Sequence, residues 1–220
     1  MIFGKIDFIN LLPFHIYLKK HIQSSQVKLI IEHNKSYPSN INNKFLKGKV
    51  NSAFISSIAS YKKKSLNLGI IAKNDVQSVL LICGENKEDY QSQTSNALAK
   101  VLNLEGEVII GDKALKFFHE NKDKEFIDLA KYWKDKYNLP FVFARLCFNK
   151  DGNKLQKIVK KFKKEHIKIP RYILNQYSKR SSISQQNILE YLKKIDYEIS
   201  YKEKKALKLF FGLCKEKGLL

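Results

Sequence analysis

Hydrophobic and polar residues follow two alternating patterns over the first two thirds of the chain. Short runs of β-branched and other apolar residues are typical of buried strands, whereas apolar residues three and four positions apart are typical of helices packed on one face. This alternation predicts an α/β fold. The expected strands cover residues 2–9, 27–33, 50–55, 66–72, 76–83, 108–110 and 140–148. The expected helices cover residues 14–23, 38–47, 57–64, 92–102, 112–119 and 125–137.

The last third of the chain shows the helical spacing alone. Ile188, Leu192 and Ile195, for example, lie four and three residues apart. This spacing predicts a helical C-terminal tail. Its expected helices cover residues 154–166, 170–179, 184–195 and 200–217.

Two long apolar strands, at 76–83 and 140–148, enclose one α/β block. If the chain crosses between two lobes at these strands, they form a two-strand hinge. Lobe one would then comprise residues 1–76 and 148–220, including the helical tail, and lobe two residues 77–147. Because ligands of open α/β sheets bind beyond the carboxyl ends of the strands, we expect a ligand cleft between the lobes.

Polar residues follow several of the expected strands, at the points where helices begin. Asn10 follows the first strand, Ser56 and Ser57 follow the strand at 50–55, and Asp112 follows the strand at 108–110. Helix N-termini carry unpaired backbone N–H groups and a partial positive charge, so they favour anions. Several such junctions in one chain predict a site for a small carboxylate.

Other polar residues add candidates for this site. Thr94, Ser95 and Asn96 open the helix at 92–102, and Ser78 interrupts an apolar strand, where a hydroxyl needs a hydrogen-bond partner. Each also has an ordinary structural explanation. Ser, Thr and Asn cap helices, Asn10 suits a turn, and Ser78 could be a satisfied core residue. The local pattern leaves both interpretations open, and a capping residue can also line a site.

The net charge of +20 suggests a protein that binds nucleic acid, but the excess of lysine over arginine does not support this interpretation. Three of the 41 basic residues are arginines and the other 38 are lysines. Base readout and bidentate phosphate binding favour arginine. The lysines are spread along the chain, which is typical of solvated helix faces. We expect no nucleic-acid partner, although the positive field would attract an anionic substrate.

Cysteine and histidine patterns give no sign of a metal or redox site. Cys83, Cys147 and Cys214 are far apart and form no CxxC, which is typical of reduced thiols in a cytoplasmic protein. The five histidines show no metal-ligand spacing. No apolar run reaches ~20 residues, and the start shows no signal-peptide pattern. We therefore expect a cytoplasmic protein without a cofactor or a membrane partner; its oligomeric state stays open.

Six motifs, taken in chain order, resemble those of the chorismate dehydratases, which start the futalosine route to menaquinone. The resemblance runs from the first strand to the tail and implies a periplasmic-binding-protein-like type II fold. It also implies that chorismate loses water to give 3-[(1-carboxyvinyl)oxy]benzoate. The motifs are Gly4-Lys5-Ile6-Asp7-Phe8-Ile9-Asn10-Leu11-Leu12-Pro13, Ala53-Phe54-Ile55-Ser56-Ser57, Ser78-Val79, Thr94-Ser95-Asn96-Ala97-Leu98, Gly111-Asp112-Lys113-Ala114-Leu115 and Leu139-Pro140-Phe141-Val142-Phe143-Ala144.

The same resemblance implies roles for individual residues. Asn10 and Ser78 match residues important for activity. Asn51 departs from the family pattern, which has an acidic residue there. Because the strand ends offer no evident general base, the substrate's own enolpyruvyl carboxylate would take the proton. The expected substrate contacts are Ser56, Ser57, Thr94 and Ser95, which match carboxylate-binding turns, and the adjoining Asn96.

Two other functions share the implied fold. The 1,4-dihydroxy-6-naphthoate synthases of the same pathway carry a His-Glu pair where this chain has Gly111-Asp112. They also read Pro-Leu-Pro-Leu-Gly where residues 140–144 read Pro-Phe-Val-Phe-Ala. A non-catalytic protein that binds small carboxylates is the other alternative, and an export signal would distinguish it. The motifs favour the dehydratase.

Overall fold

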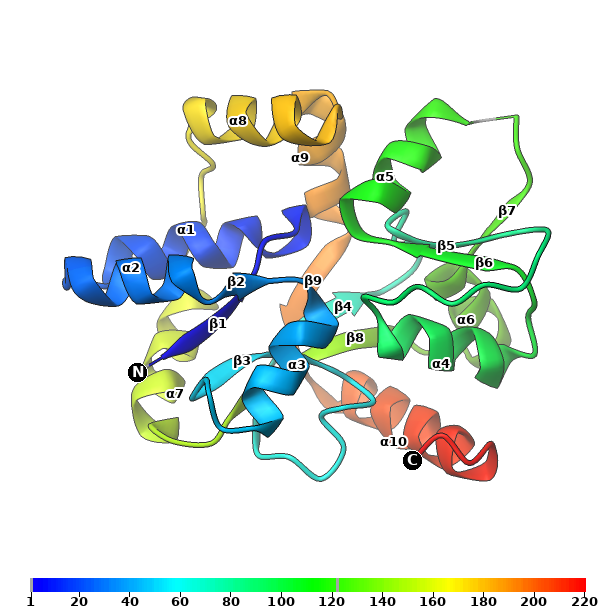
Figure 1. Cartoon of the computed structure of the whole chain (residues 1–220), viewed down its shortest axis with the longest axis horizontal. Helices are drawn as coiled ribbons and strands as arrows, with labels where there is room; N and C mark the ends of the chain where they lie inside the picture. Colours follow the sequence, from blue (N-terminus) through cyan, green and yellow to red (C-terminus); the bar gives the residue numbers. More distant parts are fainter. Residues whose placement is uncertain (1, 122) are drawn as a thin grey trace.

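The computed structural model describes residues 2–121 and 123–220 and contains two β-sheets of unequal size (Figure 1). The six-stranded sheet has the order β2-β1-β3-β8-β4-β9, and the three-stranded sheet has the order β6-β5-β7. The strands of the larger sheet are β1 (Phe3–Ile6), β2 (Lys35–Ser36), β3 (Ser52–Ser56), β4 (Ser65–Ala72), β8 (Phe141–Phe148) and β9 (Ile195–Glu198). Those of the smaller sheet are β5 (Val79–Ile82), β6 (Glu107–Ile110) and β7 (Phe126–Asp128).

Helices flank both sheets, and the chain passes twice between them, from β4 to β5 and from α6 to β8 (Figure 1). The segments that form the larger sheet also carry the 3-10 helix η1 (Ile9–Leu11), α1 (Leu12–His21), α2 (Ser25–His33), α3 (Pro38–Leu46), α7 (Gly152–Phe162), α8 (Arg171–Ser181) and α9 (Gln185–Lys193). The segment of the smaller sheet carries α4 (Gln93–Leu102), α5 (Gly111–Glu120) and α6 (Leu129–Tyr137). The last helix, α10 (Tyr201–Glu216), contacts both β8 and α4.

Strand directions mix within the larger sheet. Strand β1 runs parallel to β2 and β3, whereas β8 runs antiparallel to both of its neighbours, β3 and β4. Strand β8 is thus the return path of the chain from the smaller sheet. The carboxyl ends of β1 and β3 point the same way, so residues that follow them meet at one edge of the sheet.

A buried aromatic cluster fixes the last helix to the two neighbouring elements. Trp133 on α6 is fully buried, and its ring centroid lies 5.2 Å from that of Phe141 on β8 and 6.1 Å from that of Phe210 on α10. The indole N–H also donates to the backbone oxygen of Pro140 over 3.2 Å. Tilted and edge-to-face ring pairs of this kind add to the energy of burial.

The strand expected at 27–33 is wrong, because this segment is helix α2. Its apolar run resembles a buried strand, but only one face of it is buried. Leu29 and Ile30 are 69% and 41% exposed, whereas Ile31 is 6% exposed. The side chain of Ser24 caps the helix by accepting a hydrogen bond from the backbone N–H of Val27.

Two expected helices in the middle of the chain also differ from the structure. Residues 57–64 form turns, since the hydroxyl of Ser60 donates to the oxygen of Ser57, and Lys62 adopts a left-handed φ of 58°. Side-chain bonds of this type compete with helix. Residues 125–137 divide into β7 and α6, because Asp128 caps α6 through the N–H groups of Ala130 and Lys131.

The tail is helical except for strand β9, which the expected helix at 184–195 overlooked. Strand β9 pairs antiparallel with β4 and forms an edge of the larger sheet. The strand expected at 76–83 is shorter in the structure, since β5 begins at Val79. None of the helices among the described residues combines the length and the apolar character needed to cross a bilayer.

Candidate active site

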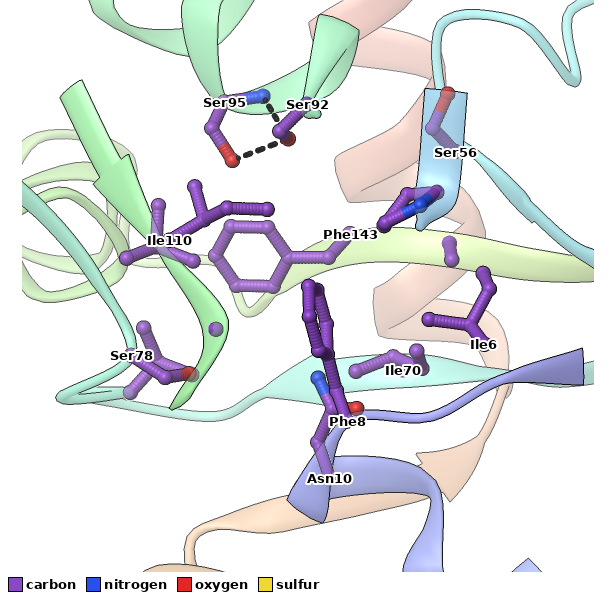
Figure 2. Close-up of a pocket in the computed structure, with 15 residues that line it drawn as sticks. Ile6, Phe8, Asn10, Ser56, Ile70, Ser78, Ser92, Ser95, Ile110 and Phe143 are labelled. Carbon is purple, nitrogen blue, oxygen red and sulfur yellow. Dashed lines mark hydrogen bonds between the residues drawn. The ribbon is translucent and has the colours of Figure 1, made fainter. Parts of the chain in front are cut away.

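A cavity opens between the two sheets, at the carboxyl ends of β1, β3 and β6 (Figure 2). It contains about 560 Å³ of empty space, part of which is open to solvent. Its polar lining residues are Asn10, Ser56, Ser78, Ser92 and Ser95. Its apolar lining comprises Ile6, Phe8, Pro38, Ile70, Val76, Val79, Ile110, Gly111, Phe143 and Ala144.

The lining of this cavity is uncharged. Among the described residues, no Asp, Glu, Lys, Arg or His side chain lines it. The walls offer hydroxyls, one amide and the N-terminus of α4, where the helix dipole places partial positive charge. A negative ligand would therefore be held by hydrogen-bond donors, within the positive field of a chain of net charge +20.

Asn10 and Ser78 lie beside two tyrosines of the tail, Tyr197 and Tyr191. The hydroxyl oxygens of Ser78 and Tyr191 lie 2.8 Å apart, and Tyr197 donates to the backbone oxygen of Asn10 over 2.6 Å. The side-chain oxygen Oδ1 of Asn10 is buried and has no hydrogen-bond partner among the described residues. A buried acceptor without a partner is costly, so this oxygen is available to a ligand's donor.

Burial keeps the tyrosines of this network protonated. It raises the pKa of Tyr191 well above that of an exposed tyrosine, and hydrogen bonds with Ser78 and Asn10 offset only part of the rise. Burial likewise raises the pKa of Tyr197. Either hydroxyl can be the donor in the Ser78–Tyr191 pair, and in the arrangement where Tyr191 donates, the hydrogen of Ser78 is free to point at a ligand.

On the side of the larger sheet, Ser56 is held by Asn42 on α3. The amide of Asn42 donates to the hydroxyl oxygen of Ser56 over 2.8 Å and accepts from its backbone N–H over 3.1 Å. Asn42 also donates to Gln93 over 3.2 Å, which ties this corner to α4. The oxygen of Ser56 thus accepts one hydrogen bond, and its hydroxyl hydrogen has no acceptor among the described residues.

On the opposite side, Ser92 and Ser95 form the N-terminal cap of α4 (Figure 2). The hydroxyl oxygen of Ser92 accepts from the backbone N–H of Ser95 over 3.2 Å, and the two hydroxyls lie 2.8 Å apart. The capping role expected for this segment is confirmed, and both residues also line the cavity.

Three of the expected substrate contacts do not line the cavity and bind protein groups instead. Ser57 donates to the backbone oxygen of Val142, and Thr94 accepts from the backbone N–H of Ile58 over 3.2 Å. Asn96 accepts from the backbone N–H of Asp89 over 3.0 Å and donates to its oxygen over 2.8 Å. The structure thus brings together Asn10, Ser56, Ser78 and Ser95 of the expected set.

Phe8 and Phe143, which the sequence analysis did not single out, turn their rings into the cavity (Figure 2). Phe8 also packs on Gly111, where an added Cβ would lie 2.9 Å from ring carbons. Gly111 has a φ of +65°, so both its conformation and its neighbour require glycine. The sequence signal for Phe143 is its place near the start of the long apolar strand at 140–148, but its position in the cavity follows only from the order of the strands.

An ionic cluster beside the cavity joins α5 to the end of β1. Asp112 accepts from the backbone N–H of Ile9 over 3.1 Å and pairs with Arg180 over 3.2 Å, and Arg180 also pairs with Asp7 over 2.6 Å. Burial alone would raise the pKa of Asp7, but hydrogen bonds from Tyr177 and Lys35 and the charge of Arg180 hold it well below the usual range. Asp112 is thus a structural acid, and its side chain is not among those that line the cavity.

No three His, Cys, Asp or Glu side chains gather in the described part of the chain in a way that could hold a metal ion. Neither a thiol nor an imidazole is found among the described residues that line the cavity. Its chemistry is that of hydrogen-bond donors placed around flat apolar walls. Such a site can orient a small anion and stabilise charge that develops during a reaction.

Comparisons with known proteins point in one direction. The family model for menaquinone biosynthesis matches residues 89–216. The chorismate dehydratase of Campylobacter jejuni subsp. jejuni serotype O:23/36 (strain 81-176) is 47% identical to this chain over 223 residues, covering the whole of both chains.

Solved structures with the same fold are much more distant in sequence. A protein of Archaeoglobus fulgidus matches with a TM-score of 0.69 at 12% identity, over 99% of this chain and 97% of its own. An ABC transporter protein of Parabacteroides distasonis matches with a TM-score of 0.58 at 12% identity, over 97% of this chain and 91% of its own. These similarities concern the fold alone, and the two sheets with their flanking helices agree with the expected two-lobed α/β fold.

Proposed function

The chain belongs to the chorismate dehydratase family, and we propose that the cavity between its two sheets is where chorismate loses water. The enzyme is a hydro-lyase of menaquinone biosynthesis, and its product is 3-[(1-carboxyvinyl)oxy]benzoate. The observation that carries the site assignment is the pair Asn10 and Ser78. One offers a buried acceptor without a partner, the other a hydroxyl oriented by Tyr191, and both line an uncharged cavity.

The reaction needs orientation more than it needs a strong acid or base. The proton on ring carbon C3 leaves, its bonding electrons form a new ring double bond, and the C4–oxygen bond breaks with its electrons on oxygen. The departing hydroxide takes up one proton and becomes water, and the ring becomes aromatic. Aromatisation supplies the driving force, so the protein contributes by holding one reactive geometry.

The proposed proton acceptor is the enolpyruvyl carboxylate of the substrate. The cavity lining supports this assignment, because none of its described side chains is a carboxylate, imidazole or amine. Asn10 would accept from the C4 hydroxyl and so orient it, and Ser78 would donate to the leaving oxygen. Tyr191, by donating to Ser78, would keep that hydrogen directed at the substrate.

The two substrate carboxylates would bind at opposite sides of the cavity. Ser56 offers its hydroxyl hydrogen from one side, and the N-terminus of α4 offers Ser92 and Ser95 from the other. The rings of Phe8 and Phe143 would form flat walls for the substrate ring. In this proposal the remaining expected contacts do not touch the substrate, but their hydrogen bonds to the backbone hold the segments that carry these donors. These residues are Ser57, Thr94 and Asn96.

We further propose that the lobes divide near residues 76 and 147 and that the enzyme acts on the futalosine route, in the cytoplasm. The three free cysteines support a reducing compartment. The Arg180 cluster supports a closed arrangement, because it joins α5 of one lobe to β1 of the other.

The direct test is to mix the purified protein with chorismate and follow the aromatic product by ultraviolet absorbance and mass spectrometry. We expect conversion without an added cofactor. The Asn10→Ala protein should be slower by ~10²–10³-fold, the usual effect of losing one such polar contact. Unchanged chorismate would contradict the reaction, and the substrate of the naphthoate synthase should then be tried. A folded Asn10→Ala protein with wild-type turnover would contradict the role of Asn10.

A further inference from the structure

A second pocket lies away from the cavity, between α10, β8 and the turn at 57–64. It contains about 800 Å³ of empty space, part of which is open solvent, and it shares no lining residue with the cavity. Helix α10 runs beside β8 here (Figure 1). The side chains that characterise this pocket, called the α10 pocket below, are Tyr61, Arg145, Lys204, Lys208, Phe211 and Lys215.

Arg145 is half-buried in this pocket without a countercharge. Its guanidinium donates to the hydroxyls of Ser60 and Ser65 over 2.8 and 3.2 Å and to the backbone oxygen of Ser60, all of which are neutral acceptors. No carboxylate within the described residues forms an ion pair with it. Arg180, by contrast, pairs with two aspartates. A partly desolvated guanidinium without an acid is unfavourable unless an anion neutralises it.

The lysines around Arg145 add to the uncompensated charge. Lys204, Lys208 and Lys215 are exposed on one side of α10, and none of them forms an ion pair with a described residue. The Nζ of Lys215 lies 5.2 Å from the ring centroid of Tyr61. Four cations without acids therefore surround one concave surface, whereas elsewhere many lysines have acidic partners, as Lys163 has in Glu198.

The pocket also has an aromatic wall. The rings of Tyr61 and Phe211 lie 5.1 Å apart between centroids, at an interplanar angle of 57°. The guanidinium of Arg145 stands over Phe211, with 5.5 Å from its carbon Cζ to the ring centroid. Cations next to ring faces suit a ligand that carries both a negative group and a flat apolar part.

We propose that the α10 pocket is a second binding site, for a small organic anion in which a phosphate or carboxylate group adjoins a flat ring. The anionic group pairs with Arg145 and the lysines of α10, and the ring packs on Tyr61 and Phe211. This site is separate from the dehydratase cavity and stands independently of the function assigned there.

The test uses phenyl phosphate as the probe and two backbone amides as reporters. Gly212 lines the α10 pocket and Gly111 lines the cavity, so two-dimensional ¹H–¹⁵N spectra of the full chain distinguish the sites. We expect a saturable shift of the Gly212 amide. Methyl phosphate, which lacks the ring, should bind at least threefold more weakly there.

Paired variants keep the net charge equal. Lys204→Gln with Lys208→Gln removes two exposed lysines of the pocket, and Lys157→Gln with Lys161→Gln removes two exposed lysines four residues apart on α7. The first pair should weaken phenyl phosphate binding at Gly212 at least fivefold, and the second should leave it unchanged. A Gly212 amide that does not move, or equal affinity in both variants, would overturn the proposal and leave a solvated lysine face.

Discussion

Replacing Tyr191 with phenylalanine is the sharpest perturbation of the proposed site. The change removes one hydroxyl, whose oxygen lies 2.8 Å from the hydroxyl oxygen of Ser78. Tyr191 and Ser78 are both 2% exposed, so water cannot easily replace the lost partner. A buried hydroxyl left without its hydrogen bond costs about 1–3 kcal/mol, so the free energy of unfolding should fall by that amount.

The same change should slow the reaction. Without Tyr191 as donor, the hydroxyl of Ser78 is free to rotate away from the leaving oxygen. Losing a donor outright costs ~10²–10³-fold in rate, so a misdirected donor should cost about 10- to 100-fold in kcat. KM for chorismate should change less than threefold, since the groups that hold the carboxylates are untouched.

Tyr17→Phe is the matched control for this variant. Tyr17 is 1% exposed, and its hydroxyl donates to the backbone oxygen of Ile158 over 3.1 Å, remote from the cavity lining. Urea unfolding of both variants should show similar losses of stability, and a steady-state assay with chorismate should show slower turnover for Tyr191→Phe alone. Equal kcat values for the two folded variants would refute the reasoning about Ser78.

Three further predictions concern other parts of the chain. Burial lowers the pKa of His15 to about 4, against about 6.5 when unfolded, so the unfolded state takes up the proton first as the pH falls. The free energy of unfolding should therefore fall by about 3 kcal/mol from pH 6.5 to pH 4. Urea midpoints of a His15→Gln protein should lack this loss, and midpoints that fall equally with pH in the wild type and the variant would contradict the prediction. Native protein at pH 8 should react with a thiol reagent at the exposed Cys83 alone, because burial raises the pKa of Cys147 to about 12 and that of Cys214 to about 11; three equally fast thiols would be the contrary result. Gly111→Ala should destabilise the protein by about 1–2 kcal/mol through its left-handed backbone and its contact with a phenylalanine ring, and an unchanged thermal midpoint would oppose this.

The alternation of apolar and amphipathic segments was enough to predict the α/β class and most of the elements. It failed where local pattern and burial disagree. Residues 27–33 form an apolar run that is buried on one face only, and a short run of this kind fits a strand or a helix equally well. Strand β9 has only four residues, and it is a strand because β4 lies beside it, which no local pattern shows.

The site was predictable only in part, for a similar reason. Polar residues at strand ends marked Asn10 and Ser56, since such positions meet at one edge of a sheet, and polar residues at the start of a helix marked Ser95. Tyr191 lies in a tail helix, and no local sequence pattern distinguishes it from the other buried residues there. Its partner Ser78 is 113 positions earlier, so their hydrogen bond depends on the complete fold.

The single tryptophan of the chain, Trp133, is enclosed where α6, β8 and α10 meet. Its fluorescence therefore reports on one place, the contact of α10 with α6 and β8. A red shift of the emission while the circular dichroism stays constant would show that α10 detaches before the sheets unfold. The protein thus carries an intrinsic optical label for the order in which its parts come apart, and no dye has to be attached to read it.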